Sequence, residues 1–319
     1  MRPRAYHPIG GIPVRPPARL WLPSVLLVTA ALTVWVVPGS AAAYLTPPPA
    51  VPLLPPCHPS ASSLRPTGPP RVTPGSFMEQ IRDRGRLIAG VSEYTYPFGF
   101  FNPLHRKPEG FDIDIVHAIA KAIFGNPNKV EFKAISDLQR IPEVQSGGVD
   151  IVAHTMTILC QRLYYVDFSS VYFNAGAQVL VPKNSLAKGL ADLGGQKVCA
   201  TAGSDSIAHI NAARSHPIPF PVMNFTDCLM LLQQRDVAAI STDNNILDGL
   251  AAQDPWTKVV GSPFTSEPYG LAMSQQHPGF VRFVNAVLQQ MRTDGQWADD
   301  YRDWVGHSVP APPRARYKD

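Results

Sequence analysis

The sequence has little cysteine and lacks the closely spaced cysteine or histidine pairs that are typical of zinc sites. Only four cysteines occur in 319 residues, and neither a C-x-x-C nor an H-x-x-x-H spacing is present. Zinc sites combine such closely spaced ligands, so the sequence predicts no metal site and indicates no cofactor. It also shows no tandem repeat, and no serine, histidine and aspartate follow in the order of a hydrolase triad. The sequence therefore gives no sign of an enzyme.

Acidic residues are missing from the first 43 positions, which contain Arg2, Arg4, Arg15 and Arg19. These four arginines account for the whole formal net charge of +4, since 4 − 4 = 0 remains for the rest of the chain. The body thus has no basic excess of the kind that indicates nucleic-acid binding.

Residues 1–43 have the pattern of an export signal. A basic start precedes the apolar run Trp21–Val37, and Ala41-Ala42-Ala43 then provides an A-x-A cleavage pattern. This run contains Pro23 and is at the short limit for a spanning helix, so a cleaved signal peptide and an uncleaved anchor both remain open. We expect an exported protein of the cell envelope or periplasm, either secreted or tethered to the outer face of the cytoplasmic membrane.

Residues 44–75 are predicted to be a linker. They contain the proline runs Pro47–Pro49, Pro55–Pro56 and Pro69–Pro70, a composition that favours an extended chain without its own core. Cys57 lies in this stretch directly after two prolines. A lipoprotein cysteine follows small residues instead, so we do not expect lipidation.

Strand and helix patterns alternate along the rest of the chain, which indicates α/β sheets with parallel pairs. The expected helices are 76–84, 111–125, 137–145, 204–213 and 227–235, and the expected strands are 86–91, 130–134, 149–153, 197–201, 221–224 and 238–240. Two such runs are separated near 175–182 and therefore indicate two lobes. We expect lobe 1 over 76–176 plus 268–307, lobe 2 over 177–267 and a C-terminal tail over 308–319.

Five sequence blocks follow one another along residues 76–306. They are Gly110–Ala120 (GFDIDIVHAIA), Asp150–Thr157 (DIVAHTMT) with the nearby Gln161-Arg162 and Val166–Ser169, Thr201–Ser206 (TAGSDS), Ser241–Asn244 (STDN) and Tyr269–Ala272 (YGLA). Together they resemble the extracellular solute-binding proteins of family 3, which bind polar amino acids. Actinobacterial glutamine- and glutamate-binding proteins are the most similar, because they also carry cysteine around the second and third blocks.

The resemblance implies the α/β, two-lobed type II periplasmic-binding-protein fold. Each lobe would be a mixed sheet flanked by helices, and the chain would cross between the lobes twice. The lobes would close around a ligand by a hinge at 175–178 and 268–270.

A free amino acid carries an α-carboxylate and an α-ammonium, and both lose free energy on burial unless they meet fixed partners. By the family motifs, Arg162 would hold the carboxylate through paired guanidinium contacts. Backbone N–H groups at Gly203, Ser204, Asp205 and Ser206 would bind the same anion at a helix start. Taken alone, Arg162 could equally be a surface arginine and Gly203 a tight bend.

The α-ammonium would be bound by Asp243, with help from the Thr157 hydroxyl and the Thr155 backbone. Asp243 alone could be a turn residue. These assignments come from the resemblance and from the order of the blocks.

The ligand's side chain would be selected by Arg140, which matches a position used by aspartate- and glutamate-binding relatives. This favours aspartate or glutamate, with asparagine and glutamine weaker, and His154 could add a donor. Alternatively, Arg140 forms a helix-surface ion pair with Asp137. Asp137 matches a pocket position in relatives, and its carboxylate would repel an acidic ligand. The choice between an acidic, an amide and a basic ligand therefore remains open.

Ser92 departs from the relatives, which carry Asp or Arg at that position. The aromatic residues Tyr94, Tyr96 and Phe98 would form an apolar wall of the pocket. Packing in the core is the alternative for these three side chains.

Four cysteines in an exported chain predict disulfides, with three possible connectivities. Cys160 lies in lobe 1, whereas Cys199 and Cys228 both lie in lobe 2. A bridge between the lobes would hinder ligand exchange, so we expect Cys57–Cys160 and Cys199–Cys228.

The expected function is a non-enzymatic receptor that binds aspartate, glutamate, asparagine or glutamine and delivers it to the permease of an ABC importer. One alternative is a receptor domain that signals through a membrane sensor protein. The other is a cyclohexadienyl dehydratase-like enzyme on the same fold, but His154 and Asp137 have no evident orienting partner for acid–base work.

Overall fold

The computed structural model describes residues 57–319. The expected export signal over 1–43 and residues 44–56 of the expected linker lie outside the described residues. Within residues 57–319, no helix combines the length and the apolar character needed to cross a membrane.

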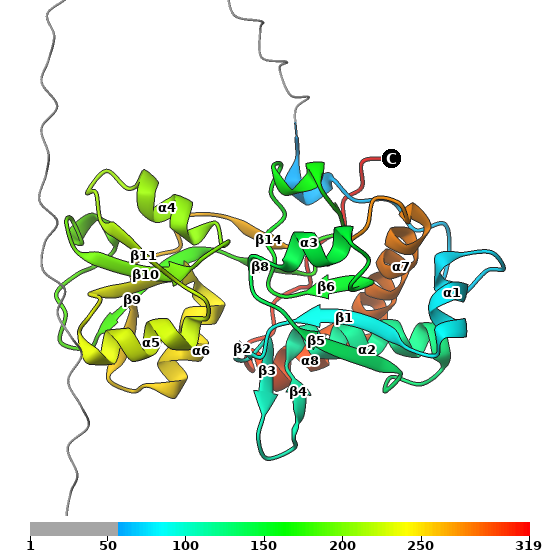
Figure 1. Cartoon of the computed structure of the whole chain (residues 1–319), viewed down its shortest axis with the longest axis horizontal. Helices are drawn as coiled ribbons and strands as arrows, with labels where there is room; N and C mark the ends of the chain where they lie inside the picture. The colour runs from blue at the N-terminus through cyan, green and yellow to red at the C-terminus, as the bar shows by residue number, and fades with distance from the viewer. Residues whose placement is uncertain (1–56) are drawn as a thin grey trace, which may run out of the picture. The chain divides into compact units, whose positions relative to one another are not determined.

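The first lobe is built on a mixed five-stranded sheet (Figure 1). Its strands, in spatial order, are β5 (Val130–Ala134), β1 (Leu87–Val91), β6 (Ile151–Ala153), β15 (Ala272–Met273) and β7 (Asp167–Phe168). Strand β1 pairs in parallel with β5 and β6, whereas β15 runs antiparallel to β6 and β7. A separate hairpin sheet contains β2 (Tyr94–Thr95), β3 (Gly99–Asn102) and β4 (Lys107–Glu109).

Helices cover both faces of this first sheet. The larger core lies against α1 (Phe77–Arg84), α2 (Phe111–Phe124), α7 (Pro278–Asp294) and α8 (Gln296–Trp304). The smaller core lies against α3 (Arg140–Gln145). Ile151 and Ala153 belong to the larger core and Val152 to the smaller one, because successive side chains of a strand point to opposite faces.

The second lobe contains another mixed sheet. Its strands, in spatial order, are β11 (Ile218–Val222), β10 (Lys197–Thr201), β12 (Ala239–Asp243), β9 (Ala177–Pro182) and β13 (Thr257–Val260). Strand β10 is parallel to β11 and β12, and β9 is antiparallel to β12 and β13. Figure 1 shows α4 (Ser206–Ala212) on one face, and α5 (Phe225–Gln234) and α6 (Asn244–Gln253) on the other.

Two strands connect the lobes. The chain leaves the first sheet through β8 (Phe173–Ala175) and returns through β14 (Glu267–Tyr269), and these two strands pair antiparallel to each other. Short 3-10 turns complete the elements at η1 (Pro59–Ala61), η2 (Arg162–Tyr164) and η3 (Leu190–Asp192). Two mixed α/β lobes with two crossings are the architecture that the sequence predicted.

Helix ends follow local signals where those signals are strong. The Ser76 hydroxyl accepts the Glu79 N–H at the start of α1, and Gly125 ends α2 with a φ of 71°. The helix expected from Asp137 begins only at Arg140, and the helix expected from Ser204 begins at Ser206. Both starts are delayed by side chains that bond within a preceding turn and so compete with the helix.

Residues 57–75 of the expected linker are bonded to the first lobe and to the C-terminal tail. The buried Ser63 hydroxyl donates to the Phe168 carbonyl, and Asn285 donates to Ser63 and Leu64. The Lys318 N–H donates to Ser63 in turn. A proline-rich segment forms few hydrogen bonds within itself, so the first lobe and the C-terminal tail provide its hydrogen-bond partners.

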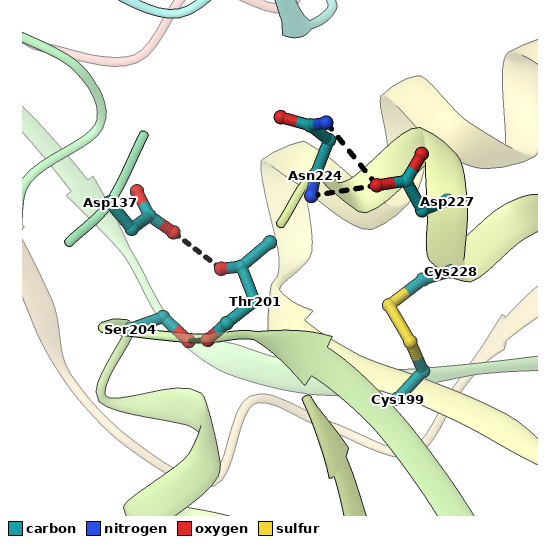
Figure 2. Close-up of a disulfide and its surroundings, with 7 residues drawn as sticks. All are labelled: Asp137, Cys199, Thr201, Ser204, Asn224, Asp227 and Cys228. Carbon is teal, nitrogen blue, oxygen red and sulfur yellow. Dashed lines mark hydrogen bonds between the residues drawn. A yellow bond between two sulfur atoms is a disulfide. The ribbon is translucent and has the colours of Figure 1, made fainter. Parts of the chain in front are cut away.

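Both expected disulfide pairings are present. Cys57–Cys160 fastens the proline-rich stretch to the first lobe, and Cys199–Cys228 joins β10 to α5 in the second (Figure 2).

Candidate functional site

The residues of the second, third and fourth blocks meet between the two lobes. Arg162 of η2 and Arg140 of α3 come from the first lobe, and Asp205 and Asp243 from the second. The second-lobe residues lie just beyond β10 and at the end of β12, where the carboxyl ends of these parallel strands meet. Ligands bind at this edge of α/β sheets.

Arg162 is 8% exposed and is held in one orientation. Its Nη1 donates to the Thr157 carbonyl at 2.7 Å, and its Nη2 lies 3.8 Å from Asp205 Oδ1. Burial, together with the nearby charge of Arg140, lowers the pKa of Arg162 to about 10. The guanidinium therefore stays charged at neutral pH and can bind a carboxylate.

Asp205 directs its carboxylate toward Arg162, a role that the sequence did not predict. Burial alone would raise its pKa, but the positive charge of Arg162, together with the smaller effects of Glu267, Arg140 and His209, outweighs burial and lowers it. The Ser204 N–H donates to Thr201 within a turn and is thus engaged before any ligand arrives. Gly203 adopts a φ of 86°, and a Cβ there would lie 2.9 Å from Leu138, so a glycine suits this bend.

Asp243 is 6% exposed and lies at the last position of β12. The Tyr269 hydroxyl donates to its carboxylate. Burial, and next the charge of Asp205, raise the pKa of Asp243 well above its ordinary value. A cationic group beside Asp243 would favour the carboxylate form, so this position suits an ammonium.

Thr157 and Thr155 lie on the loop after β6 and have different roles. Thr157 gives its carbonyl to Arg162 and bridges to Tyr269 of β14. The Thr155 N–H donates to the buried Asp112 at 2.8 Å, and Tyr172 donates to the same carboxyl group at 2.7 Å. The first acid of the GFDID block therefore fixes the shape of this loop.

Arg140 forms the ion pair with Asp137 that was the alternative to ligand binding. Its Nη1 lies 3.1 Å from Asp137 Oδ1, and both side chains are buried rather than on a helix surface. Arg140 also donates to the carbonyls of His154 and Gly203 at 3.2 and 3.3 Å. The positive charge of Arg140 is thus already balanced inside the site.

Asp137 also connects the lobes, as Figure 2 shows, because it accepts a hydrogen bond from the Thr201 hydroxyl of β10. His154 Nδ1 lies 3.5 Å from Asp137, and His154 Nε2 lies 3.0 Å from the Ile135 carbonyl. Burial lowers the pKa of His154, so its imidazole is neutral at pH 7.

The expected aromatic wall divides into two parts. Phe98 is buried in the first-lobe core with Phe111 and Phe173, which bears out core packing for this residue. Tyr94 and Tyr96 are exposed and line a cavity of about 370 Å³ with Thr226, Ala252 and Gln253 of the second lobe. Ser92 bonds to Thr95 and to the Tyr94 N–H, so its hydroxyl closes a turn.

Glu267 is the site residue that the sequence analysis missed. It is 2% exposed and lies in β14, next to Asp205. Burial, and next the charge of Asp205, raise the pKa of Glu267 to about 7. An acid two residues before the Tyr269 block was its only signal in the sequence.

Comparisons with known sequences place the chain in a family. A family described as bacterial extracellular solute-binding proteins, family 3, matches residues 87–307. The ABC transporter glutamine-binding protein GlnH of Bacillus subtilis (strain 168) is 38% identical over 226 residues, or 70% of this chain and 83% of that protein. The glutamine-binding protein of Geobacillus stearothermophilus is 37% identical over 206 residues, or 64% of this chain and 79% of that protein.

A solved structure with the same arrangement is an ancestral arginine-binding protein bound to glutamine. Its TM-score to this chain is 0.66 at 37% identity, and the match covers 70% of this chain and 99% of that one.

Proposed function

The chain belongs to the bacterial extracellular solute-binding proteins of family 3, and from this we propose that it is an extracytoplasmic receptor that closes around glutamine. Its fold is the two-lobed type II fold of periplasmic amino-acid-binding proteins. Its relatives are binding proteins, one of them of an ABC transporter, so the chain is a binding protein and not an enzyme. Neither the dehydratase alternative nor the sensor alternative gains support from these relatives.

Two buried groups of opposite charge support amino-acid binding. Arg162 would take the α-carboxylate and Asp243 the α-ammonium, and both are more than nine-tenths buried. Each charge-assisted hydrogen bond contributes about 1.5–3 kcal/mol. Four of them at the upper value give about 12 kcal/mol, and an association cost of about 4 kcal/mol leaves about −8 kcal/mol, which corresponds to a micromolar dissociation constant.

The Arg140–Asp137 pair supports glutamine over glutamate, and this contact carries the proposal. A glutamate side chain would place a second carboxylate near Asp137 without an unbalanced cation to receive it. An amide is neutral and can use the polar groups around the pair without adding charge. We therefore replace the expected acidic ligand with its amide.

The relatives support a proposal for what happens to the bound ligand and where the protein acts. The relatives from Bacillus subtilis and Geobacillus stearothermophilus are glutamine-binding proteins, and the first belongs to an ABC transporter. We propose that this chain likewise delivers its ligand to the permease of an ABC importer. The family is extracellular. A tether to the outer face of the cytoplasmic membrane, through the stretch before residue 57, would keep the receptor near that permease.

Thermal unfolding of the exported chain with each of the twenty amino acids tests the ligand. A ligand at a hundredfold excess over its Kd stabilises the folded state by about 2.7 kcal/mol. We expect the largest rise in Tm with glutamine, and calorimetry should then give a lower Kd for glutamine than for glutamate, asparagine or aspartate. Tighter binding of either acid overturns the choice of glutamine, and no response to any amino acid overturns the receptor itself.

A further inference from the structure

Two carboxyl groups and an imidazole gather beside Arg162, and amino-acid binding does not use them all. Asp205 precedes α4, His209 lies one turn later in that helix, and Glu267 lies in the connecting strand β14. Each residue offers one ligand atom, and these three atoms lie within 4.8 Å of one another. The imidazole Nε2 of His209 is 3.8 Å from Glu267 Oε1.

Each of these side chains has a buried polar atom that is not satisfied. Asp205 Oδ2, His209 Nδ1 and Glu267 Oε2 have no hydrogen-bond partner among residues 57–319. Glu267 is 98% buried, and a buried carboxyl oxygen without a partner lowers stability by about 1–3 kcal/mol. A positive ion shared by the three side chains would satisfy both carboxyl groups at once.

We infer that Asp205, His209 and Glu267 form a binding site for a divalent transition-metal ion of the zinc class. Zn²⁺ binds imidazole nitrogen and carboxylate oxygen at about 2.0–2.2 Å, so tetrahedral ligands lie roughly 3.5 Å apart. The three atoms, which lie within 4.8 Å of one another, would have to move closer together to reach that spacing. Ca²⁺ and Mg²⁺ fit poorly, because they require about six or more ligands that are mainly oxygen.

No local pattern in the sequence indicated this site. Asp205 and His209 are four positions apart and share one face of the chain at the start of α4, but Glu267 arrives through the return crossing. A bound ion would join α4 of the second lobe to β14. It would also draw the Asp205 carboxylate into coordination and away from Arg162, which lies 3.8 Å from it.

Calorimetric titration of the chelator-treated exported chain with Zn²⁺ tests the site. We expect one tight site in the wild type, and at least about tenfold weaker binding in His209→Ala and in Glu267→Gln, since even indirect partners of metal ligands contribute about 10- to 100-fold. The matched control is His105→Ala. His105 contacts Glu109 at 2.7 Å but is 60% exposed, so its loss should leave the tight site intact.

No Zn²⁺ binding by the wild type, or unchanged binding in His209→Ala, overturns the inference. Equal losses in His209→Ala and His105→Ala overturn it as well, because they would indicate scattered surface histidines. Thermal unfolding in chelator checks that each variant is folded. Amino-acid titration in chelator keeps this test separate from the proposed function: a chain that binds glutamine but not Zn²⁺ lacks only the metal site, and the reverse result refutes only the receptor.

Discussion

Gly249 of α6, in the second lobe, lies directly against the backbone carbonyl of Tyr96 in the first. A Cβ atom at position 249 would lie 1.9 Å from the Tyr96 oxygen, which is far inside any real contact. The two lobes can approach this closely only because residue 249 has no side chain.

Gly249→Ala should therefore weaken ligand binding without unfolding the chain. The added methyl group keeps the lobes apart, and an overpacked contact opposes closure by about 1–3 kcal/mol, or about 5- to 150-fold in affinity. The same change should raise helix stability by up to about 1 kcal/mol, because alanine is the better helix former. Calorimetry with glutamine and urea unfolding measure the two effects, which have opposite signs.

Gly279→Ala is the matched control. Gly279 is also helical, in α7, and a Cβ there would meet nothing within 4 Å. This variant should keep its affinity for glutamine. Unchanged affinity in Gly249→Ala would show that the lobes do not need this close approach when ligand is bound.

Arg162→Lys should remove measurable binding of every amino acid. An ammonium cannot reproduce the paired contact of a guanidinium with a carboxylate, and it cannot also keep the 2.7 Å bond to the Thr157 carbonyl. Loss of about 3 kcal/mol or more moves a micromolar Kd toward the millimolar range. Asp243→Asn should do comparable damage at the α-ammonium, and calorimetry measures both.

Arg282→Lys provides the comparison for these two variants. Arg282 pairs with Asp319 at 2.6 Å on the first lobe, away from the proposed pocket residues, so binding should not change. Near-wild-type affinity in both Arg162→Lys and Asp243→Asn would refute the pocket assignment.

Asp137→Asn should shift the preference from glutamine toward glutamate. The amide oxygen can still accept the Thr201 hydrogen bond, but the charge of Arg140 is no longer balanced. A ligand carboxylate then gains a charge-assisted contact of about 1.5–3 kcal/mol, so the ratio of the two Kd values should move toward glutamate by about tenfold or more. Asp192→Asn, which removes an exposed carboxylate that accepts the Lys188 N–H, should leave that ratio unchanged. An unchanged ratio of the two Kd values in Asp137→Asn contradicts the proposed role of the Arg140–Asp137 pair.

Local signals in the sequence were enough to predict much of the fold. The bounds of β5 and β10 match the expected strands, because a short β-rich run determines each of them without distant contacts. The end of α2 was predicted by Gly125. Helix α6 was not expected, since it follows Asp243 immediately and no side-chain cap marks its start. Its position depends on burial against the second sheet, which the sequence does not display locally.

The site shows the same limit. The block order proposed Arg162 and Asp243 as site residues, but it did not show which partner each charged group has in the fold. Whether Arg140 faces a ligand or Asp137 depends on how α3 meets the loop after β6, and Glu267 reaches the site only through the return crossing. These are contacts between distant segments, and no local pattern specifies them.

A buried carboxyl group outside the binding site, that of Asp300, should make the stability of the chain depend on pH. Asp300 of α8 is buried, and Gln296 donates to its Oδ1 at 2.6 Å. Burial raises the pKa of Asp300 from 3.8 to about 7. The Gln296 hydrogen bond lowers this pKa, whereas the negative charges of Asp114 and other nearby acids raise it. The folded chain therefore holds a proton that the unfolded chain has already released between these two values.

The stability contributed by this proton should be complete below about pH 4 and should decline as the pH rises to about 7, because the unfolded state binds fewer protons over that interval. Asp300→Asn is neutral at every pH and should be free of this decline. Its stability relative to the wild type should thus be higher at pH 8 than at pH 5, as measured by urea unfolding. Asp299→Asn, which changes an exposed neighbour in the same helix, should show a much smaller difference between the two pH values. If Asp300→Asn has the same relative stability at both, the buried carboxyl group does not titrate in this range, and Gln296 holds it as a carboxylate.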